Sequence, residues 1–257
     1  RVLRSDGSAI PGLYAAGELV GGLFYQTVGV TAAYLIAASL YVAALSLVLG
    51  AAHSQRHRPL KPSRLLAEIA EAVRIAAAQP ALRMVLGVTV VMNVFGFSYT
   101  GILPAFGAIA FQADPLGIGL LAAAEPFGAL LTGLILAMRR GAQPGRATLA
   151  VGATGFLCVL VLAAFAPSLP LAALFLMIGG LGTAAFSSLQ TGIVMMEAPP
   201  EARSRILGLT TTCIGTGPLG VLLIGALADA QGPRLAILGM AVTGLVGLGL
   251  VLAFTKR

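Results

Sequence analysis

A single acidic residue lies inside a long apolar stretch, and its type and position could support proton chemistry. Glu125 is the only charged side chain between Leu116 and Met138, and Pro126 follows it directly. A carboxylate inside a membrane span costs at least ~2.5 kcal/mol on insertion, so it should face other helices or a wet cavity. Pro126 cannot donate to the helical ladder and frees backbone carbonyls beside the acid. We predict that Glu125 exchanges protons; the alternative is a kink with a protonated, hydrogen-bonded glutamate.

Three weaker polar candidates also fall inside apolar runs, namely Asn93, Tyr99 and Gln190. We expect them to line a cavity for a small-molecule substrate. Gln190 follows three glycines, Gly179, Gly180 and Gly182, which let helices approach closely. Helix packing is therefore the default interpretation of that region, and ligand contact is the alternative.

Neither histidine nor cysteine chemistry is indicated. His53 and His57 lie one helical turn apart, but no cysteine or carboxylate accompanies them, which favours a solvated linker over a metal site. Cys158 and Cys213 both fall in apolar spans, where each should behave as a small buried hydrophobe. The sequence thus predicts no metal site and no disulfide.

The composition fixes the setting of these residues. The chain is 58% hydrophobic and only 10% charged, with a mean hydropathy of +0.96, against about 25% charged residues in soluble domains. The net charge of +7 could suggest nucleic acid, but the basic residues are confined to short segments between apolar runs. They are topology signals of a polytopic membrane protein, whose partner is the lipid bilayer and not nucleic acid.

The apolar runs predict an all-α membrane bundle of about seven transmembrane helices. They cover 28–52, a span from about 84 that bends at Pro104 before a turn at 112–115, 116–138, 147–165, about 171–196, 206–228 and 235–255. The domains are then a segment 1–26, a helix 27–52, a linker 53–81 and a six-helix bundle 82–257. In the linker, Ser63 can cap a helix on which Leu65, Ile69 and Val73 share one face; we expect it along the membrane surface, ending at Pro80.

The basic residues segregate to one side of the predicted spans. That side holds Arg56, Arg58, Lys61, Arg64, Arg139, Arg140, Arg146, Arg203, Arg205, Lys256 and Arg257. The turns on the other side hold only Arg234. By the positive-inside rule the first side is cytoplasmic. We therefore predict a multi-pass protein of the bacterial inner membrane with a cytoplasmic carboxyl terminus, whose cytoplasmic gating loops carry Arg139, Arg140, Arg146, Arg203 and Arg205.

Residues 1–26 differ from the rest of the chain. The sequence Ile-Pro-Gly-Leu-Tyr-Ala-Ala-Gly-Glu at 10–18, followed by Gly-Gly-Leu-Phe-Tyr at 21–25, resembles the carboxyl-terminal FAD-contacting segment of fumarate-reductase-like and ketosteroid-dehydrogenase-like flavoproteins. That resemblance implies that Gly17 and Glu18 approach the ribityl and phosphate portion of a flavin. The glycine-rich strand-to-helix turn that would hold the pyrophosphate is absent, so we predict no cofactor.

From about Gly21 onward the sequence resembles helices six to twelve of a major facilitator superfamily transporter, in the enterobactin-exporter-like branch. The motifs that carry the resemblance are 79–83 (Gln-Pro-Ala-Leu-Arg), 93–95 (Asn-Val-Phe), 103–105 (Leu-Pro-Ala), 199–206 (Pro-Pro-Glu-Ala-Arg-Ser-Arg-Ile), 217–220 (Gly-Pro-Leu-Gly) and 225–229 (Gly-Ala-Leu-Ala-Asp). The segment 225–234 imitates the cytoplasmic gating motif of the superfamily but falls on the outer side, so we interpret it as a look-alike. The true counterpart of the motif is then the segment 139–146, which is degenerate.

The resemblance implies proton-driven export of a small amphipathic molecule, siderophore-like or drug-like, and no enzymatic activity. It also implies a missing amino-terminal transporter half as a partner, with a fusion, frameshift or assembly join expected near 21–23. Two alternatives stay open: a membrane-tethered FAD-dependent oxidoreductase fragment, and a membrane fragment that is inactive in transport by itself.

The orientation can be tested by labelling. A cysteine introduced at Ala142 should react with an impermeant thiol reagent only from the cytoplasm, and one at Ala113 only from outside, because the basic residues segregate so sharply. The reversed pattern of labelling would contradict the orientation.

Overall fold

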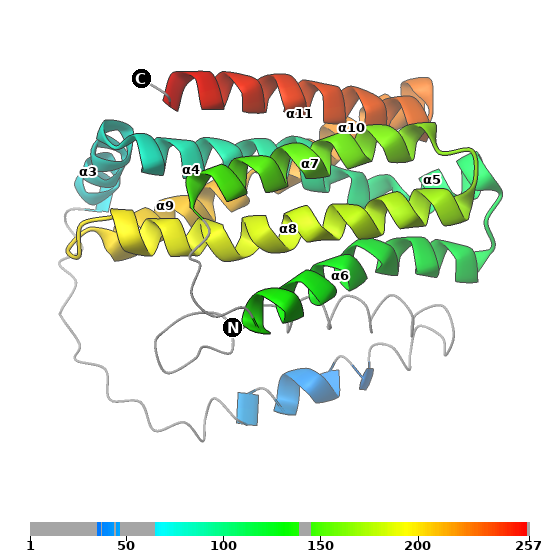
Figure 1. Ribbon diagram of the computed structural model, residues 1–257, viewed down its shortest axis with the longest axis horizontal. Helices are drawn as coiled ribbons and strands as arrows, with labels where there is room; N and C mark the ends of the chain where they lie inside the picture. The colour runs from blue at the N-terminus through cyan, green and yellow to red at the C-terminus, as the bar shows by residue number, and fades with distance from the viewer. Residues whose placement is uncertain (1–34, 37, 44, 47–64, 139–144, 256–257) are drawn as a thin grey trace.

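The computed structural model describes residues 35–36, 38–43, 45–46, 65–138 and 145–255 (Figure 1). The flavoprotein-like segment 1–26, the linker 53–64 with its two histidines, and Arg139 and Arg140 therefore lie outside the described residues. Of the span predicted at 28–52, only the pieces between 35 and 46 are described, and these are helical.

The elements of the described chain from residue 65 onward are all helical. They are α3 (Leu65–Ala78), α4 (Pro80–Val91), a π-helix (Met92–Gly96), a 3₁₀-helix (Phe97–Ile102), α5 (Leu103–Phe111), α6 (Pro115–Met138), α7 (Arg146–Phe165), α8 (Leu169–Glu197), α9 (Arg203–Ile214), α10 (Gly217–Gln231) and α11 (Pro233–Thr255). The long helices lie alongside one another, and α3 lies at the end of the bundle where α9 begins (Figure 1). The predicted all-α fold is confirmed.

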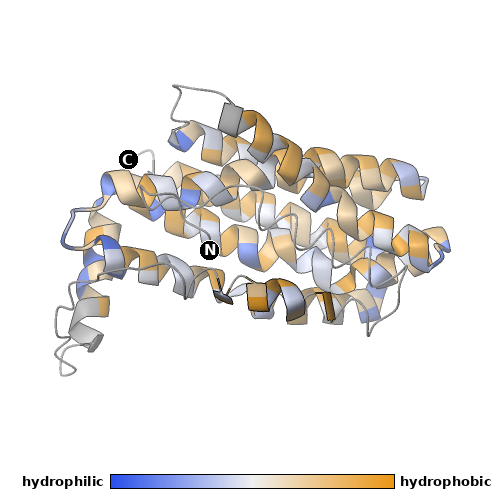
Figure 2. Ribbon diagram, turned by 90° about the horizontal axis from the view of Figure 1, so that it is seen from below, coloured by the Kyte–Doolittle hydropathy of each residue, from blue (hydrophilic) through white to orange (hydrophobic). Residues whose placement is uncertain are grey.

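Six segments of the described chain are long and apolar enough to cross a membrane. They are 80–111, 115–135, 146–165, 169–197, 203–231 and 233–255. Hydrophobic residues extend along the length of these helices (Figure 2). Large apolar side chains such as Val151, Leu222 and Phe254 face outward, which lipid tails tolerate and water does not. The last six predicted spans are thereby confirmed as elements, with ends shifted by a few residues.

The first of these segments is not a regular helix, and its irregularity extends further than the predicted bend at Pro104. The backbone leaves α-helical geometry at Met92, twelve residues before Pro104, and passes through the π-helix and the 3₁₀-helix. It breaks again at Ile102, and Pro104 lies in the first turn of α5, where a missing backbone N–H costs nothing. Gly220 of α10 sits against the backbone carbonyl of Val94, and a methyl group there would overlap it. The backbone of α10 therefore lies directly against the π-helix at this point.

The span predicted at 206–228 is interrupted as well. It comprises α9 and α10, which are separated at Gly215 and Thr216. The N–H of Gly215 still donates to the carbonyl of Thr211 at 3.0 Å, but the N–H of Thr216 donates to Cys213 at 3.3 Å, a tighter turn. Pro218 lies in the first turn of α10, where proline is tolerated. The glycine and proline residues of this region therefore divide one span into two helices.

Glycines bring α6, α7 and α8 into backbone contact. A methyl group on Gly180 of α8 would overlap the carbonyl oxygen of Glu125 in α6, and one on Gly128 of α6 would overlap the carbonyl of Met177. A methyl group on Gly182 of α8 would likewise overlap the carbonyl oxygen of Gly152 in α7. Small residues allow such close approach between membrane helices. The packing interpretation of the glycines after Gly179 is thereby confirmed.

Helix α3 forms within the predicted linker and packs against α4 and α9. Ala72 and Ala76 face the bundle and are buried, whereas Ile69 and Val73 are exposed. The two exposed residues belong to the face that we expect to touch the membrane surface, and that location stays a prediction. Ser63, the expected cap, lies outside the described residues.

Backbone contact between α6 and α8 leads to a paired test on one helix. Replacing Gly180 with Ala should destabilise the protein by about 1–3 kcal/mol, because the new methyl group cannot fit without moving α6. Gly192→Ala, also in α8, meets nothing within 4 Å and should be neutral or stabilising by up to ~1 kcal/mol, the helix propensity difference. Thermal unfolding in detergent measures both. Equal midpoints for the two variants would show that the α6–α8 contact is not tight.

Candidate functional site

The predicted acid lies at the contact between α6 and α8. Glu125 is half-buried in α6, and Pro126 beside it is buried within a helix that continues to Met138. The hydroxyl of Thr183 in α8 donates a hydrogen bond to Oε1 of Glu125. Thr183 itself is only 3% exposed. The carboxyl group thus faces a neighbouring helix, as the cost of an intramembrane charge requires.

The three helices α5, α6 and α8 carry few ionisable residues besides Glu125. Helix α6 carries no further ionisable residue, α5 carries none, and α8 carries only Glu197. Glu197 lies seventeen residues beyond Gly180, roughly 25 Å along the helix at 1.5 Å per residue. Among these three helices, α8 supplies the acid with a polar contact, the hydrogen bond from Thr183.

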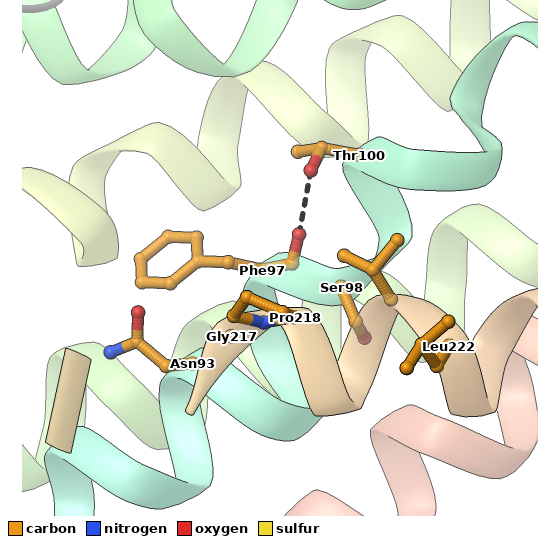
Figure 3. Close-up of a pocket in the computed structure, with 8 residues that line it drawn as sticks. Asn93, Phe97, Ser98, Thr100, Gly217, Pro218 and Leu222 are labelled. Atoms are coloured by element: carbon orange, nitrogen blue, oxygen red, sulfur yellow. Dashed lines mark hydrogen bonds between the residues drawn. The ribbon is translucent and has the colours of Figure 1, made fainter. Parts of the chain in front are cut away.

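A pocket of about 600 Å³ lies between the two interrupted spans (Figure 3). Its lining residues share a position beside irregular backbone: Asn93, Phe97, Ser98 and Thr100 on one span and Gly217, Pro218, Val221 and Leu222 on the other. Non-helical backbone at membrane depth is tolerated where it is buried in protein or lines a cavity. The π-helix, the 3₁₀-helix and the start of α10 meet that condition here.

The lining of this pocket is apolar with a few polar groups. Asn93 is half-buried, and its Nδ2 donates to the carbonyl of Thr89 at 2.8 Å. The hydroxyl of Thr100 donates to the carbonyl of Phe97 at 2.8 Å, the bond drawn in Figure 3. Phe97, Val221 and Leu222 supply the apolar surface. Such a lining suits an amphipathic ligand, which gains from apolar burial and is oriented by few polar contacts.

The other two cavity candidates do not line this pocket. Tyr99 is buried, with its ring 6.0 Å from that of Phe156. Gln190 is 5% exposed, and its Nε2 donates to the hydroxyl of Thr89 at 2.7 Å. Thr89 is also the residue whose carbonyl holds Asn93. Gln190 therefore joins α8 to α4 directly behind the pocket, so its role in this arrangement is packing by hydrogen bonds.

The described basic candidates occupy one end of the bundle. Arg205 in α9 pairs with Glu71 of α3 at 2.8 Å, at a partly exposed site, where an ion pair is worth about 0–1 kcal/mol. The Nε of Arg203 donates to the carbonyl of Ala198 at 3.2 Å, at the end of α8. Arg146 is exposed at the start of α7. Arg139 and Arg140 lie outside the described residues.

Arg234 has a structural role that its sequence position did not reveal. Its Nη1 donates to the carbonyls of Ala164 and Ala166 at 2.8 Å each, at the end of α7. Its guanidinium also lies over the ring of Phe111, 4.8 Å from the centroid, in a cation–π contact. The arginine of the gating-motif look-alike therefore holds the ends of α5 and α7 together at the start of α11.

Thr183 is the other residue that the sequence interpretation missed, although it follows the glycines that the interpretation singled out.

Among the described residues, no group of three or more His, Cys, Asp or Glu side chains could hold a metal ion. Gly17 and Glu18 lie outside the described chain, so the structure does not bear on them.

The fold and these sites together describe a polytopic membrane bundle with a half-buried acid at a helix contact and a pocket between two interrupted spans, the general architecture of a membrane transporter. The model of the Major Facilitator Superfamily matches residues 88–257. The chain belongs to this superfamily.

Similar proteins agree with this assignment. The multidrug efflux pump Tap of Mycolicibacterium fortuitum is 27% identical over 257 residues, covering 95% of this chain and 60% of that protein. The pump of the same name from Mycobacterium tuberculosis (strain ATCC 25618 / H37Rv) is 28% identical over 249 residues, covering 92% of this chain and 58% of that protein. The chain thus spans about three fifths of the length of these curated relatives. They lend no support to the oxidoreductase alternative.

A solved structure is also similar, at lower identity. It is a bacterial homolog of the human lysosomal transporter Spinster, crystallised in an inward-facing and unoccupied conformation. The sequence identity is 18% and the TM-score is 0.46, over 97% of this chain and 65% of that chain.

Proposed function

We propose that this chain acts in proton-driven export of small amphipathic, drug-like molecules, with Glu125 as the group that takes up and releases the proton. The observation that carries the proposal is a carboxyl group at the centre of a superfamily span, held by Thr183 at a helix contact. Ionisable residues inside membrane spans mark proton relays and transport pathways by default.

The pocket between the two interrupted spans is the proposed substrate site. Asn93 supplies an amide and Phe97, Val221 and Leu222 supply apolar surface, in a lining that suits drug-like ligands. The similar proteins are named multidrug efflux pumps, which supports this substrate class. Within the superfamily, the narrower likeness to enterobactin exporters, and with it a siderophore substrate, stays a prediction.

The whole activity is proposed for this chain together with a further set of helices. In carriers built from paired halves, the substrate site lies at the interface between the halves, and transport rocks one half against the other. The chain covers three fifths of its relatives, so the proposed partner is an amino-terminal half. Transport by this chain alone is not part of the proposal.

The proposed location is the bacterial inner membrane, with the carboxyl terminus in the cytoplasm. Arg205 and Glu71 form an ion pair at one end of the bundle, whereas Arg234 holds the helix ends at the opposite one. This arrangement follows the segregation of the basic residues and supports the orientation. Arg146, Arg203 and Arg205 then belong to the cytoplasmic gating loops.

Replacing Glu125 with Gln tests the proton role in a carrier that includes the amino-terminal helices. Gln keeps the shape and can still accept the hydrogen bond of Thr183, but it cannot bind the proton. The variant should fold and insert and should still exchange substrate across the membrane, while pH-driven accumulation falls to the passive level. Accumulation and exchange of a labelled drug in proteoliposomes measure the two activities separately.

The matched control is Glu197→Gln, which removes an exposed carboxyl group at the end of α8. It should accumulate substrate at the parent rate. If Glu125→Gln also pumps at the parent rate, Glu125 is a structural partner of α8 and the proposed function loses its proton site.

A further inference from the structure

The hydroxyl of Thr183 lies between two acceptors. Oε1 of Glu125 is one, across the helix contact, and the carbonyl oxygen of Gly180, one turn earlier in α8, is the other, at 3.2 Å. A threonine hydroxyl has a single hydrogen and two lone pairs. It can therefore donate to only one of these oxygens at a time, while its own oxygen can accept a hydrogen bond.

The protonation state of the acid decides which bond the hydroxyl makes. An ionised carboxylate only accepts, so the hydrogen of Thr183 must point to Glu125. A protonated carboxyl group can donate its O–H to Thr183, whose hydrogen is then free to point to Gly180. In both states the buried polar groups stay paired, which avoids a cost of about 1–3 kcal/mol for a buried group left unsatisfied.

We propose that Thr183 is a positioning residue that holds Glu125 against α8 in both protonation states by turning its hydroxyl from the carboxylate to the Gly180 carbonyl. The only chemical step is the addition of one proton, supplied by the aqueous phase, to a carboxylate oxygen. The proposal deepens the proposed function, and its functional meaning rests on that function. Its geometry does not, since both acceptors lie within reach of the Thr183 hydroxyl whether or not the carrier pumps.

The packing of the site favours such a residue. The glycine contact fixes the distance between α6 and α8, because Gly180 and Gly128 leave no room for side chains between the two backbones. A hydroxyl that both donates and accepts lets Glu125 change charge without a change in helix spacing.

Infrared spectroscopy of the full chain in lipid nanodiscs tests this directly. The carbonyl stretch of a protonated carboxyl group moves to lower wavenumber when the group is hydrogen-bonded. A carboxylic band that appears on acidification and is lost in Glu125→Gln belongs to Glu125. In Thr183→Val this band should shift to higher wavenumber, because valine has the same shape but neither donates nor accepts. In Thr183→Ser the band should keep the parent position.

Thr154→Val is the matched control. It removes a threonine hydroxyl that bonds Ala150 within α7 at 2.8 Å, and it should leave the band unchanged. Thr183→Ala also removes the hydroxyl and makes the same prediction as Thr183→Val if the latter fails to fold. An unshifted band in the Val or Ala variant would overturn the proposal. So would the lack of any Glu125-dependent carboxylic band over the pH range in which the protein stays folded.

The outcome is independent of the transport assay. A band shift in Thr183→Val together with normal pumping by Glu125→Gln would leave the hydrogen-bond role in place and refute the proton role in transport. An unshifted band in Thr183→Val together with lost accumulation in Glu125→Gln would refute the hydrogen-bond role and leave the proton role in transport in place.

Discussion

Direct backbone contact between α6 and α8 is the constraint on which the rest of the structure depends. Gly180 and Gly128 remove the side chains that would keep the two helices apart, and the resulting approach places Thr183 within bonding distance of Glu125. Lipid tails are as apolar as the helices, so close packing and interhelical hydrogen bonds must supply the stability that the hydrophobic effect supplies in water. The residues that make the bundle stable are thus the ones that position its acid.

Helix α8 connects this contact to the pocket. Thr183 and Gln190 lie seven residues apart, two helical turns along the same helix. Gln190 bonds Thr89 of α4, and the carbonyl of Thr89 holds the amide of Asn93 at the pocket. The pocket itself exists because the two spans that line it are interrupted, one by π and 3₁₀ turns and one at Gly215 and Thr216. Regular α-helices would bring those backbones together without the irregular segments that line the space.

The sequence predicted the spans and the acid but not their finer surroundings. A long apolar run and an isolated carboxylate are visible within a single segment of the sequence, without knowledge of tertiary contacts. The sequence therefore predicts α6 and Glu125. Whether Gln190 and Tyr99 point toward a cavity or toward another helix depends on which helices are neighbours. The residue pattern of one helix does not determine its neighbours. The break next to Pro104 was predicted because proline is a visible helix breaker. The earlier departure at Met92 carries no such signal, and there Gly220 of α10, far along the chain, lies against the carbonyl of Val94. Arg234 belongs to the segment that imitates a gating motif, and in the structure it donates a hydrogen bond to the end of α7.

The central claim is that proton binding at Glu125 and ligand binding at the pocket are coupled, and proton release on ligand binding measures this most directly. The assembled carrier would be mixed with a drug-like ligand in weakly buffered solution while the pH is recorded. Because linkage between two sites is reciprocal, the account predicts release of about one proton per ligand bound by the parent protein and none by Glu125→Gln. Equal release by both proteins, or ligand binding without release by the parent, would contradict it.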